Sequence, residues 1–144
     1  MKHSQITCSQ KGKTFILYTN GVTFSINNID NGINNKNKKC DYLVMKNTKD
    51  IQIFIELKDS NIAQAYEQIL MSYENREILQ GLPLKYYAAI VCTRYPQIDP
   101  TIQNLQKKAK KLFEKIFVKS KKLKTQYDTK NNKITDKLAG MANC

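Results

Sequence analysis

The sequence predicts an α/β fold in which a small mixed sheet is flanked by helices. Apolar residues alternate with others along 51–58, which is typical of a strand, and they recur at helical spacing along 62–73 and 102–116. Residues 86–93 are apolar almost throughout, as in a strand that is buried on both faces. Two pairs of strands, a helix, a strand and a helix follow one another, and this order fits an α/β sandwich.

The first part of the chain is expected to contain one hairpin and one loop. Residues 1–13 predict an irregular or short helical lead-in. The apolar runs 14–18 and 22–26 flank an Asn-Gly dipeptide, which is a strong signal for a tight hairpin turn. Residues 27–39 are dense in Asn, Lys and Gly, which indicates a loop.

Two helices are expected in the second half of the chain. Residues 59–61 supply N-cap chemistry for the first helix, which should end just before the Gly-Leu-Pro run at 81–83. Asp99 and Pro100 open the second helix, because proline is tolerated in a first turn, and its apolar stripe continues to Ile116.

The chain of 144 residues is expected to form one domain at 1–124, followed by a polar and poorly periodic tail at 125–144. No apolar run approaches the length of a membrane span, and the N-terminus lacks the apolar region of a signal peptide. These features predict a cytoplasmic protein that does not contact the membrane.

The four cysteines are not at metal-ligand spacing, so no zinc site is expected. Free thiols fit a reducing compartment. Cys40 and Cys92 stand in apolar runs and are predicted to be buried as small apolar side chains.

The net charge of +12 arises from 24 basic against 12 acidic residues. Only Arg76 and Arg94 are arginines, and a lysine-rich chain favours attraction to phosphate backbones over the reading of base edges. Part of the lysine excess also fits translation of an AT-rich genome.

A run of lysines lies along the second predicted helix, and nine lysines minus the single Glu114 give +8 of the total charge. These lysines are Lys107, Lys108, Lys110, Lys111, Lys115, Lys119, Lys121, Lys122 and Lys124. The stripe predicts a nucleic-acid-binding surface, with the first five lysines as its contacts. The alternatives are a solvated lysine face and a helix that lies on a membrane surface.

The stretch from Asp41 to Lys58 contains the residues best suited to catalysis. A strand at 42–45, a turn at 46–50 and the strand that follows predict a hairpin, which lays Asp41 across from Glu56 at its open end. Glu56 and Lys58 share one face of their strand, roughly 6–7 Å apart. The alternative is that this Glu-x-Lys segment belongs to a solvated face.

Two carboxylates and a lysine in this arrangement suit a divalent metal and a phosphate. Mg²⁺ takes oxygen ligands, usually one or two carboxylates with waters and substrate phosphate. A bound metal can lower the pKa of water, and a neighbouring lysine can orient the nucleophile or neutralise developing charge. Since His3 is the only histidine, nuclease and phosphodiesterase sites built on several histidines are excluded.

Asp41 and the pair Glu56-x-Lys58 resemble the PD-(D/E)xK signature of the restriction-endonuclease-like nuclease superfamily. By pattern, the resemblance covers about residues 15–117. It implies an αβββαβ core and hydrolysis of nucleic-acid phosphodiesters that depends on Mg²⁺ (or Mn²⁺). Asp41 and Glu56 would be metal ligands, and Lys58 would assist the attacking water. Cys40 stands where the signature has proline, and no glutamate precedes Glu56 as in some branches.

Two further residues are candidates for the same site. The family often carries a glutamine on the helix after the Glu-x-Lys strand, and Gln68 is the matching residue here; the alternative is a solvated glutamine. Arg94 follows the predicted strand at 86–93 and could hold a phosphate; the alternative is a structural salt bridge.

These features together predict a Mg²⁺-dependent endonuclease, with DNA favoured over RNA, that acts alone or as a nuclease subunit in restriction, defence or repair. Specificity would come from loops, from a homodimer or from a larger protein partner. One alternative is a non-catalytic nucleic-acid-binding or assembly module on the same fold. Another is an interaction protein whose basic helix docks on an acidic partner. No Gly-rich phosphate loop or nucleophile elbow is apparent.

Overall fold

Nine strands and two helices make up the part of the chain that the computed structural model describes, which is residues 5–28, 40–58, 61–76, 84–94 and 97–138. In order they are β1 (Gln5–Gln10), β2 (Lys13–Tyr18), β3 (Phe24–Asn28), β4 (Tyr42–Lys46), β5 (Ile51–Lys58), α1 (Ile62–Glu74), β6 (Lys85–Cys92), α2 (Pro100–Lys110), β7 (Lys115–Ser120), β8 (Lys122–Asp128) and β9 (Lys133–Thr135). The predicted α/β class is confirmed, but the prediction of one mixed sheet flanked by helices is corrected. The chain forms two mixed sheets, and the second sheet, not a helix, covers one face of the central sheet.

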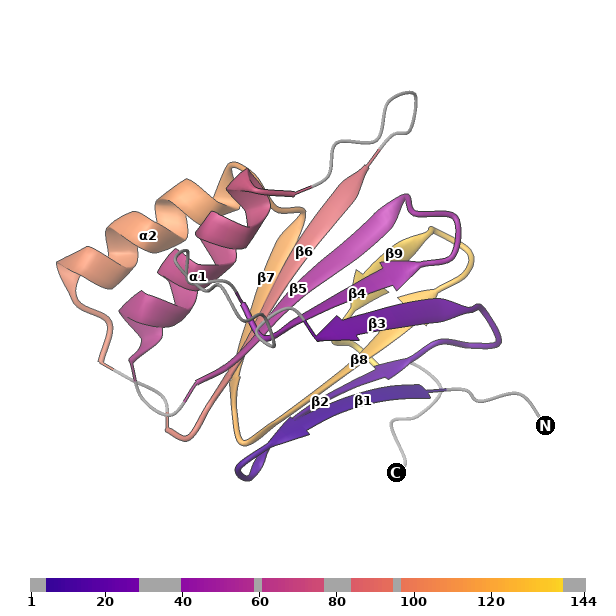
Figure 1. The fold of residues 1–144 in the computed structure, drawn as a ribbon, viewed down its shortest axis with the longest axis horizontal. Coiled ribbons are helices and arrows are strands. Elements are labelled where there is room, and N and C mark those ends of the chain that lie inside the picture. Colours follow the sequence, from indigo (N-terminus) through magenta and orange to yellow (C-terminus); the bar gives the residue numbers. More distant parts are fainter. Residues whose placement is uncertain (1–4, 29–39, 59–60, 77–83, 95–96, 139–144) are drawn as a thin grey trace.

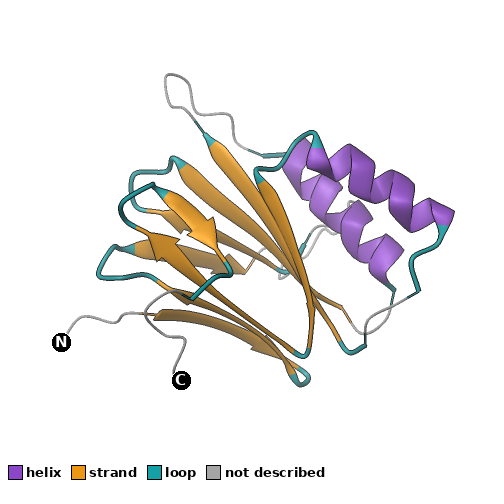
Figure 2. Cartoon of the chain, turned by 180° about the vertical axis from the view of Figure 1, so that it is seen from behind, coloured by secondary structure: helices purple, strands orange, loops and turns teal. Residues whose placement is uncertain are grey.

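The elements form three layers, with a five-stranded sheet between two helices and a four-stranded sheet (Figures 1 and 2). The central sheet has the order β3-β4-β5-β6-β7. Its first three strands are antiparallel, and β5, β6 and β7 are parallel because α1 and α2 carry the chain back between them. The outer sheet has the order β1-β2-β8-β9.

Strand β5 separates two hydrophobic cores. Ile51, Ile53, Ile55 and Leu57 enter the core between the sheets, whereas Phe54 enters the core beneath the helices. The predicted alternation along this strand is therefore confirmed. Both faces are covered, which is why polar side chains on β5 are buried as well.

The N-caps of both helices were predicted correctly. The Asn61 side chain accepts a hydrogen bond from the Gln64 N–H at 3.0 Å, and the Asp99 side chain accepts one from the Ile102 N–H at 2.8 Å. Helix α1 ends at Glu74, which is earlier than expected. The run at 81–83 lies outside the described residues.

The predicted hairpin between 14–18 and 22–26 is wrong. Asn20 and Gly21 do form a turn with positive φ of 52° and 83°, but the strands on either side enter different sheets. Phe15 of β2 and Phe24 of β3 face the same core from opposite sides. Two strands that face one core from different sheets need the same alternation of apolar and polar residues as the two strands of a hairpin. The sequence pattern therefore could not distinguish a sandwich from a hairpin.

The lead-in predicted at 1–13 is also corrected, because Gln5–Gln10 is strand β1, antiparallel to β2. The loop predicted at 27–39 begins later than expected, since β3 includes Asn27 and Asn28, and residues 29–39 lie outside the described ranges.

The second helix is much shorter than predicted, because it ends at Lys110. Residues beyond it form β7 and β8, and part of the predicted tail forms β9. Along β8, Leu123, Thr125 and Tyr127 are buried and alternate with lysines and a glutamine. This period of two was hidden by the high lysine content. Within the described residues, neither helix has the length and apolar character needed to cross a membrane.

Candidate functional site

The β4–β5 hairpin brings Asp41 and Glu56 together. Tyr42 pairs with Ile55 in the antiparallel register, so the next pair toward the open end is Asp41 and Glu56. The Asp41 N–H donates to Glu56 Oε1 at 3.1 Å, and the Leu57 N–H donates to Asp41 Oδ2 at 2.8 Å. Backbone groups of neighbouring strands therefore orient both carboxylates.

Both carboxylates are buried, with Asp41 8% exposed and Glu56 2% exposed. Among the Asp, Glu, Lys and Arg side chains of the described residues, the third buried one is Lys13, which is 3% exposed. Taking a charge out of water is costly unless other charges or hydrogen bonds compensate it. The alternative in which Glu56 belongs to a solvated face is therefore wrong. Because burying two carboxylates is costly, these residues are the first candidates for a functional site.

Lys58 completes the predicted group at the end of β5. It is half-buried and lies two residues beyond Glu56 on the same face, which places the two residues roughly 6–7 Å apart along the strand. In the parallel register it pairs with Cys92, the last residue of β6. The structure thus brings Asp41, Glu56 and Lys58 to one end of the central sheet.

Two basic residues, Lys13 and Lys121, lie at the same end of the sheet, although the sequence analysis did not assign them to this site. The Lys121 N–H donates to the Cys92 carbonyl oxygen at 2.7 Å, and the Thr14 N–H donates to the Lys121 carbonyl oxygen at 2.9 Å. These contacts join β6, the β7–β8 turn and β2, as the lower edge of Figure 1 shows. Lys13 was not expected here because residues 1–13 were predicted to be a lead-in. Lys121 was predicted to lie on the lysine stripe of the second helix, whereas the structure places it in the turn between β7 and β8.

Two thiols flank the carboxylates. Burial raises the pKa of Cys40 to about 12, with the charges of Glu56 and Asp41 adding to the effect. Burial also raises the pKa of Cys8 to about 12, again with a contribution from Asp41. Both thiols are therefore protonated at neutral pH, which makes them poor metal ligands and poor nucleophiles. The predicted burial of Cys40 and Cys92 is confirmed.

Gln68 lies on the buried face of α1, and the alternative of a solvated glutamine is wrong. Four residues later on that face, the Ser72 hydroxyl accepts a hydrogen bond from the Cys40 N–H at 2.8 Å. The face of α1 that carries Gln68 and Ser72 thus packs beside Cys40, the residue that precedes Asp41. A role for Gln68 in catalysis stays a prediction.

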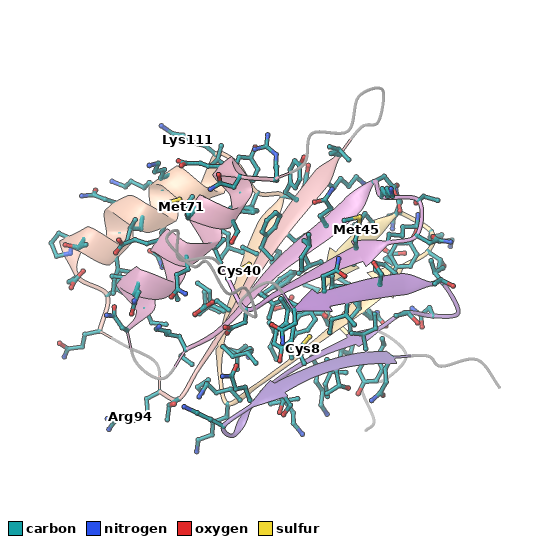
Figure 3. The ribbon with its side chains drawn as sticks, in the orientation of Figure 1. Cys8, Cys40, Met45, Met71, Arg94 and Lys111 are labelled. Carbon is teal, nitrogen blue, oxygen red and sulfur yellow. The ribbon has the colours of Figure 1, made fainter. Side chains whose placement is uncertain are left out.

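The other predicted basic residues separate into two groups (Figure 3). Arg94 is exposed and lies just beyond β6, at the carboxylate end of the sheet, and within the described ranges it forms no ion pair. Helix α2 runs back toward the opposite end, where Lys111 lies. The lysines at its C-terminal end, Lys107, Lys108, Lys110 and Lys111, are exposed there, and Lys115 begins β7 nearby. The structure does not bring these five lysines to the carboxylates.

The donor set at Asp41 and Glu56 fits a hard divalent cation. Two carboxylates can anchor Mg²⁺, with waters and substrate phosphate as its other ligands. Within the described ranges, no three or more His, Cys, Asp or Glu side chains are arranged so that they could together hold a metal ion. A site rich in nitrogen or sulfur ligands, which usually needs three or four such side chains, is therefore not present in these ranges. No family model, curated protein or solved structure matches the chain. The function must therefore be inferred from this geometry alone.

Proposed function

We propose that the chain is a metal-dependent nuclease with a restriction-endonuclease-like core and an active site at Asp41, Glu56 and Lys58. The observation that carries this proposal is the buried carboxylate pair, oriented by backbone hydrogen bonds across two neighbouring strands. The order β3-β4-β5-α1-β6 supports it, because it agrees with the βββαβ part of the implied core. Before β3 the chain departs from that core, since β1 and β2 stand where a helix would be expected.

Asp41 and Glu56 would hold Mg²⁺ (or Mn²⁺), which when bound would act as a Lewis acid and lower the pKa of water. Lys58 would place its ammonium group beside the scissile phosphate, where it neutralises negative charge that develops during attack. Lys13, buried at the same end, would partly balance the two carboxylates in the absence of substrate.

Arg94 and Lys121 would bind the phosphate backbone of the substrate near the active site. Both are exposed at the end of the sheet that carries the carboxylates. Lysine and arginine attract phosphates without regard to sequence, so these contacts would set affinity rather than specificity. DNA is the favoured substrate, the cytoplasm the favoured location, and a homodimer or a larger protein partner would supply specificity.

A second candidate function is nucleic-acid binding without catalysis. The exposed lysines of α2 favour it, because they lie at the other end of the molecule from the carboxylates. In that case the carboxylate pair would have a structural role only. Binding to nucleic acid would weaken steeply as the salt concentration rises.

The deciding experiment incubates the purified chain with supercoiled plasmid, linear duplex DNA, single-stranded DNA and RNA, each in Mg²⁺, Mn²⁺ and EDTA. We expect cutting that requires metal. Glu56→Gln keeps the size of the side chain and one acceptor for the Asp41 N–H but removes a metal ligand, so cutting should fall by at least about 100-fold.

Glu67→Gln is the matched control, because it makes the same change on the exposed side of α1 and should leave cutting unaltered. Cutting that survives Glu56→Gln would disprove the assignment of the site. Salt-sensitive binding without cutting by any variant would favour the second candidate.

A further inference from the structure

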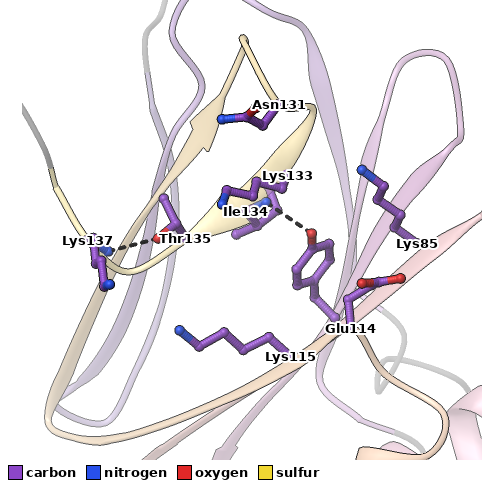
Figure 4. A pocket seen from close by; sticks show the side chains of 9 residues that line it. Lys85, Glu114, Lys115, Asn131, Lys133, Ile134, Thr135 and Lys137 are labelled. Atoms are coloured by element: carbon purple, nitrogen blue, oxygen red, sulfur yellow. Dashed lines mark hydrogen bonds between the residues drawn. The ribbon is translucent and has the colours of Figure 1, made fainter.

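A second charged site lies at the opposite end of the central sheet from the carboxylates. A cavity of about 310 Å³ opens where β9 of the outer sheet meets the first residues of β6 and β7 (Figure 4). This volume is at the lower end of the range for small-molecule pockets. Lys85 pairs with Ile51, whereas Glu56 pairs with Ile90, so about five residues, or roughly 16 Å of strand, separate the two sites.

The two sites also occupy different faces of the sheet. Tyr87 belongs to the core between the sheets, and Lys115 pairs with it in the β6–β7 register, so both point away from the helices. Asp41 and Glu56 continue the face of Leu43 and Phe54, which is the face under the helices. The cavity is therefore not an extension of the carboxylate site.

The lining is strongly basic. Four lysines, Lys85, Lys115, Lys133 and Lys137, face the cavity with one carboxylate, that of Glu114, which gives +3. Asp136 pairs with Lys115 at 3.2 Å, which leaves +2 when it is counted. Four ammonium groups gathered on one hollow repel one another, and a bound anion would relieve that repulsion.

Other contacts hold the lining in place and leave donors for a ligand. The Lys85 ammonium donates to the Asn132 carbonyl oxygen at 2.6 Å, and an ammonium group has two more hydrogens to donate. The Ile134 N–H donates to the Tyr87 hydroxyl at 3.2 Å, which is the dashed line that starts at Ile134 in Figure 4, and this hydroxyl can itself donate to an anion.

The chemistry of the lining selects phosphate over a nucleobase. Lysine is a compact point charge that suits phosphate oxygens. The Tyr87 side chain is only 3% exposed, and its ring is stacked on Phe117 in the core, with 6.3 Å between centroids and 12° between planes. Among the residues that line the cavity, it therefore does not offer an open aromatic face for a base.

We propose that this cavity, bounded by Lys85, Lys115, Lys133 and Lys137, binds a phosphate or diphosphate group. The group could belong to a free phosphate compound or to the phosphorylated end of a nucleic acid. The ligand would bridge the central sheet, through β6 and β7, to β9 of the outer sheet. Its binding does not depend on metal or on phosphodiester cutting, so this proposal stands or falls independently of the nuclease assignment.

The test measures pyrophosphate binding to the full chain by calorimetry and by thermal unfolding, in EDTA and at fixed ionic strength. We expect one site per chain and a higher melting temperature, because a ligand that binds only the folded state stabilises it. The double substitution of Lys133→Gln with Lys137→Gln should weaken binding roughly tenfold, through the loss of two nearby charges. Both lysines are exposed, so the variant should fold.

Two comparisons separate a built site from general attraction. Lys11→Gln with Lys122→Gln removes the same charge from exposed positions near the other end of the molecule and should leave the affinity unchanged. Glu114→Gln removes the one carboxylate of the lining and should tighten binding about threefold. No binding, equal weakening in the two double variants, or no gain from Glu114→Gln would overturn the proposal.

A competition experiment identifies the source of the phosphate. If a 5′-phosphorylated oligonucleotide displaces pyrophosphate and its unphosphorylated counterpart does not, the site takes the end of a nucleic acid. If both oligonucleotides fail to displace it while pyrophosphate binds, the site takes a free phosphate compound.

Discussion

The two ends of the central sheet carry charge in opposite ways. At one end Asp41 and Glu56 are buried and oriented by backbone N–H groups. At the other end, exposed lysines such as Lys133 and Lys137 surround an open cavity. Buried charges are costly but have a fixed geometry, which a reaction needs. Exposed charges cost little and attract an anion without fixing it closely. The difference supports the two proposals, a metal-dependent reaction at the first end and the binding of a phosphate group at the second.

The largest expected effect comes from a substitution of Asp41, which tests whether hydrogen bonds hold the two carboxylates in place. Asp41→Ala removes the acceptor of the Leu57 N–H, which should lower the free energy of unfolding by about 2–3 kcal/mol. Asp41→Asn keeps an oxygen at that position and should cost less than about 1 kcal/mol. Urea unfolding measures both. Equal losses would mean that the charge, and not the hydrogen bond, fixes this end.

Alkaline pH should weaken the carboxylate end next. The ordinary thiol pKa is 9.0, and in the folded chain those of Cys8 and Cys40 are raised to about 12, so the folded state holds these protons more tightly than the unfolded state. Their contribution to stability is complete below pH 9 and is lost as pH rises from 9 toward 12. The loss is on the order of 1 kcal/mol per pH unit for each thiol.

The measurement for this prediction is urea unfolding at pH 8 and pH 9.5. A variant with Cys8→Ala and Cys40→Ala should show a smaller loss, because its lysines titrate as in the parent chain while the two thiols are gone. The same loss in both proteins would contradict a contribution from the thiols.

Glu56→Gln should have a smaller effect of the opposite sign on stability. It keeps an acceptor for the Asp41 N–H and relieves the repulsion between two adjacent buried carboxylates, which Lys13 balances only in part. It should therefore raise the free energy of unfolding by about 1 kcal/mol while abolishing cutting. Thermal unfolding in EDTA measures the first effect and plasmid cutting the second. A lower melting temperature would show that Glu56 belongs to a stabilising ion-pair network. The buried charges at this end would then not be costly, contrary to the comparison made above.

The smallest effect concerns the lysine end. Tyr87→Phe removes the acceptor of the Ile134 N–H, which ties β9 to the central sheet, and should cost about 1 kcal/mol or less. Hydrogen exchange at Ile134 should accelerate, while exchange at Leu57 in the carboxylate end should not change. Faster exchange at both amides would show that the two ends are coupled.

The sequence by itself determined the parts of the molecule that depend on neighbours along the chain. The β4–β5 hairpin, the pairing of Asp41 with Glu56 and the two N-caps were all predictable, because a short turn or one helical turn sets each of them. The same local geometry placed Lys58 on the face of Glu56. Burial on both faces of β5 was not predictable, since it requires two layers built from distant segments.

Only the tertiary structure decided how the distant strands combine. The alternation along β2 and β3 fits a hairpin and a sandwich equally well, and the lysines of β7 and β8 hid a strand pattern that burial of Phe117 and Leu123 reveals. The lysine cavity also depends on how distant strands combine. Its residues come from the starts of β6 and β7 and from β9, and these meet because the outer sheet must cover the apolar face of the central one.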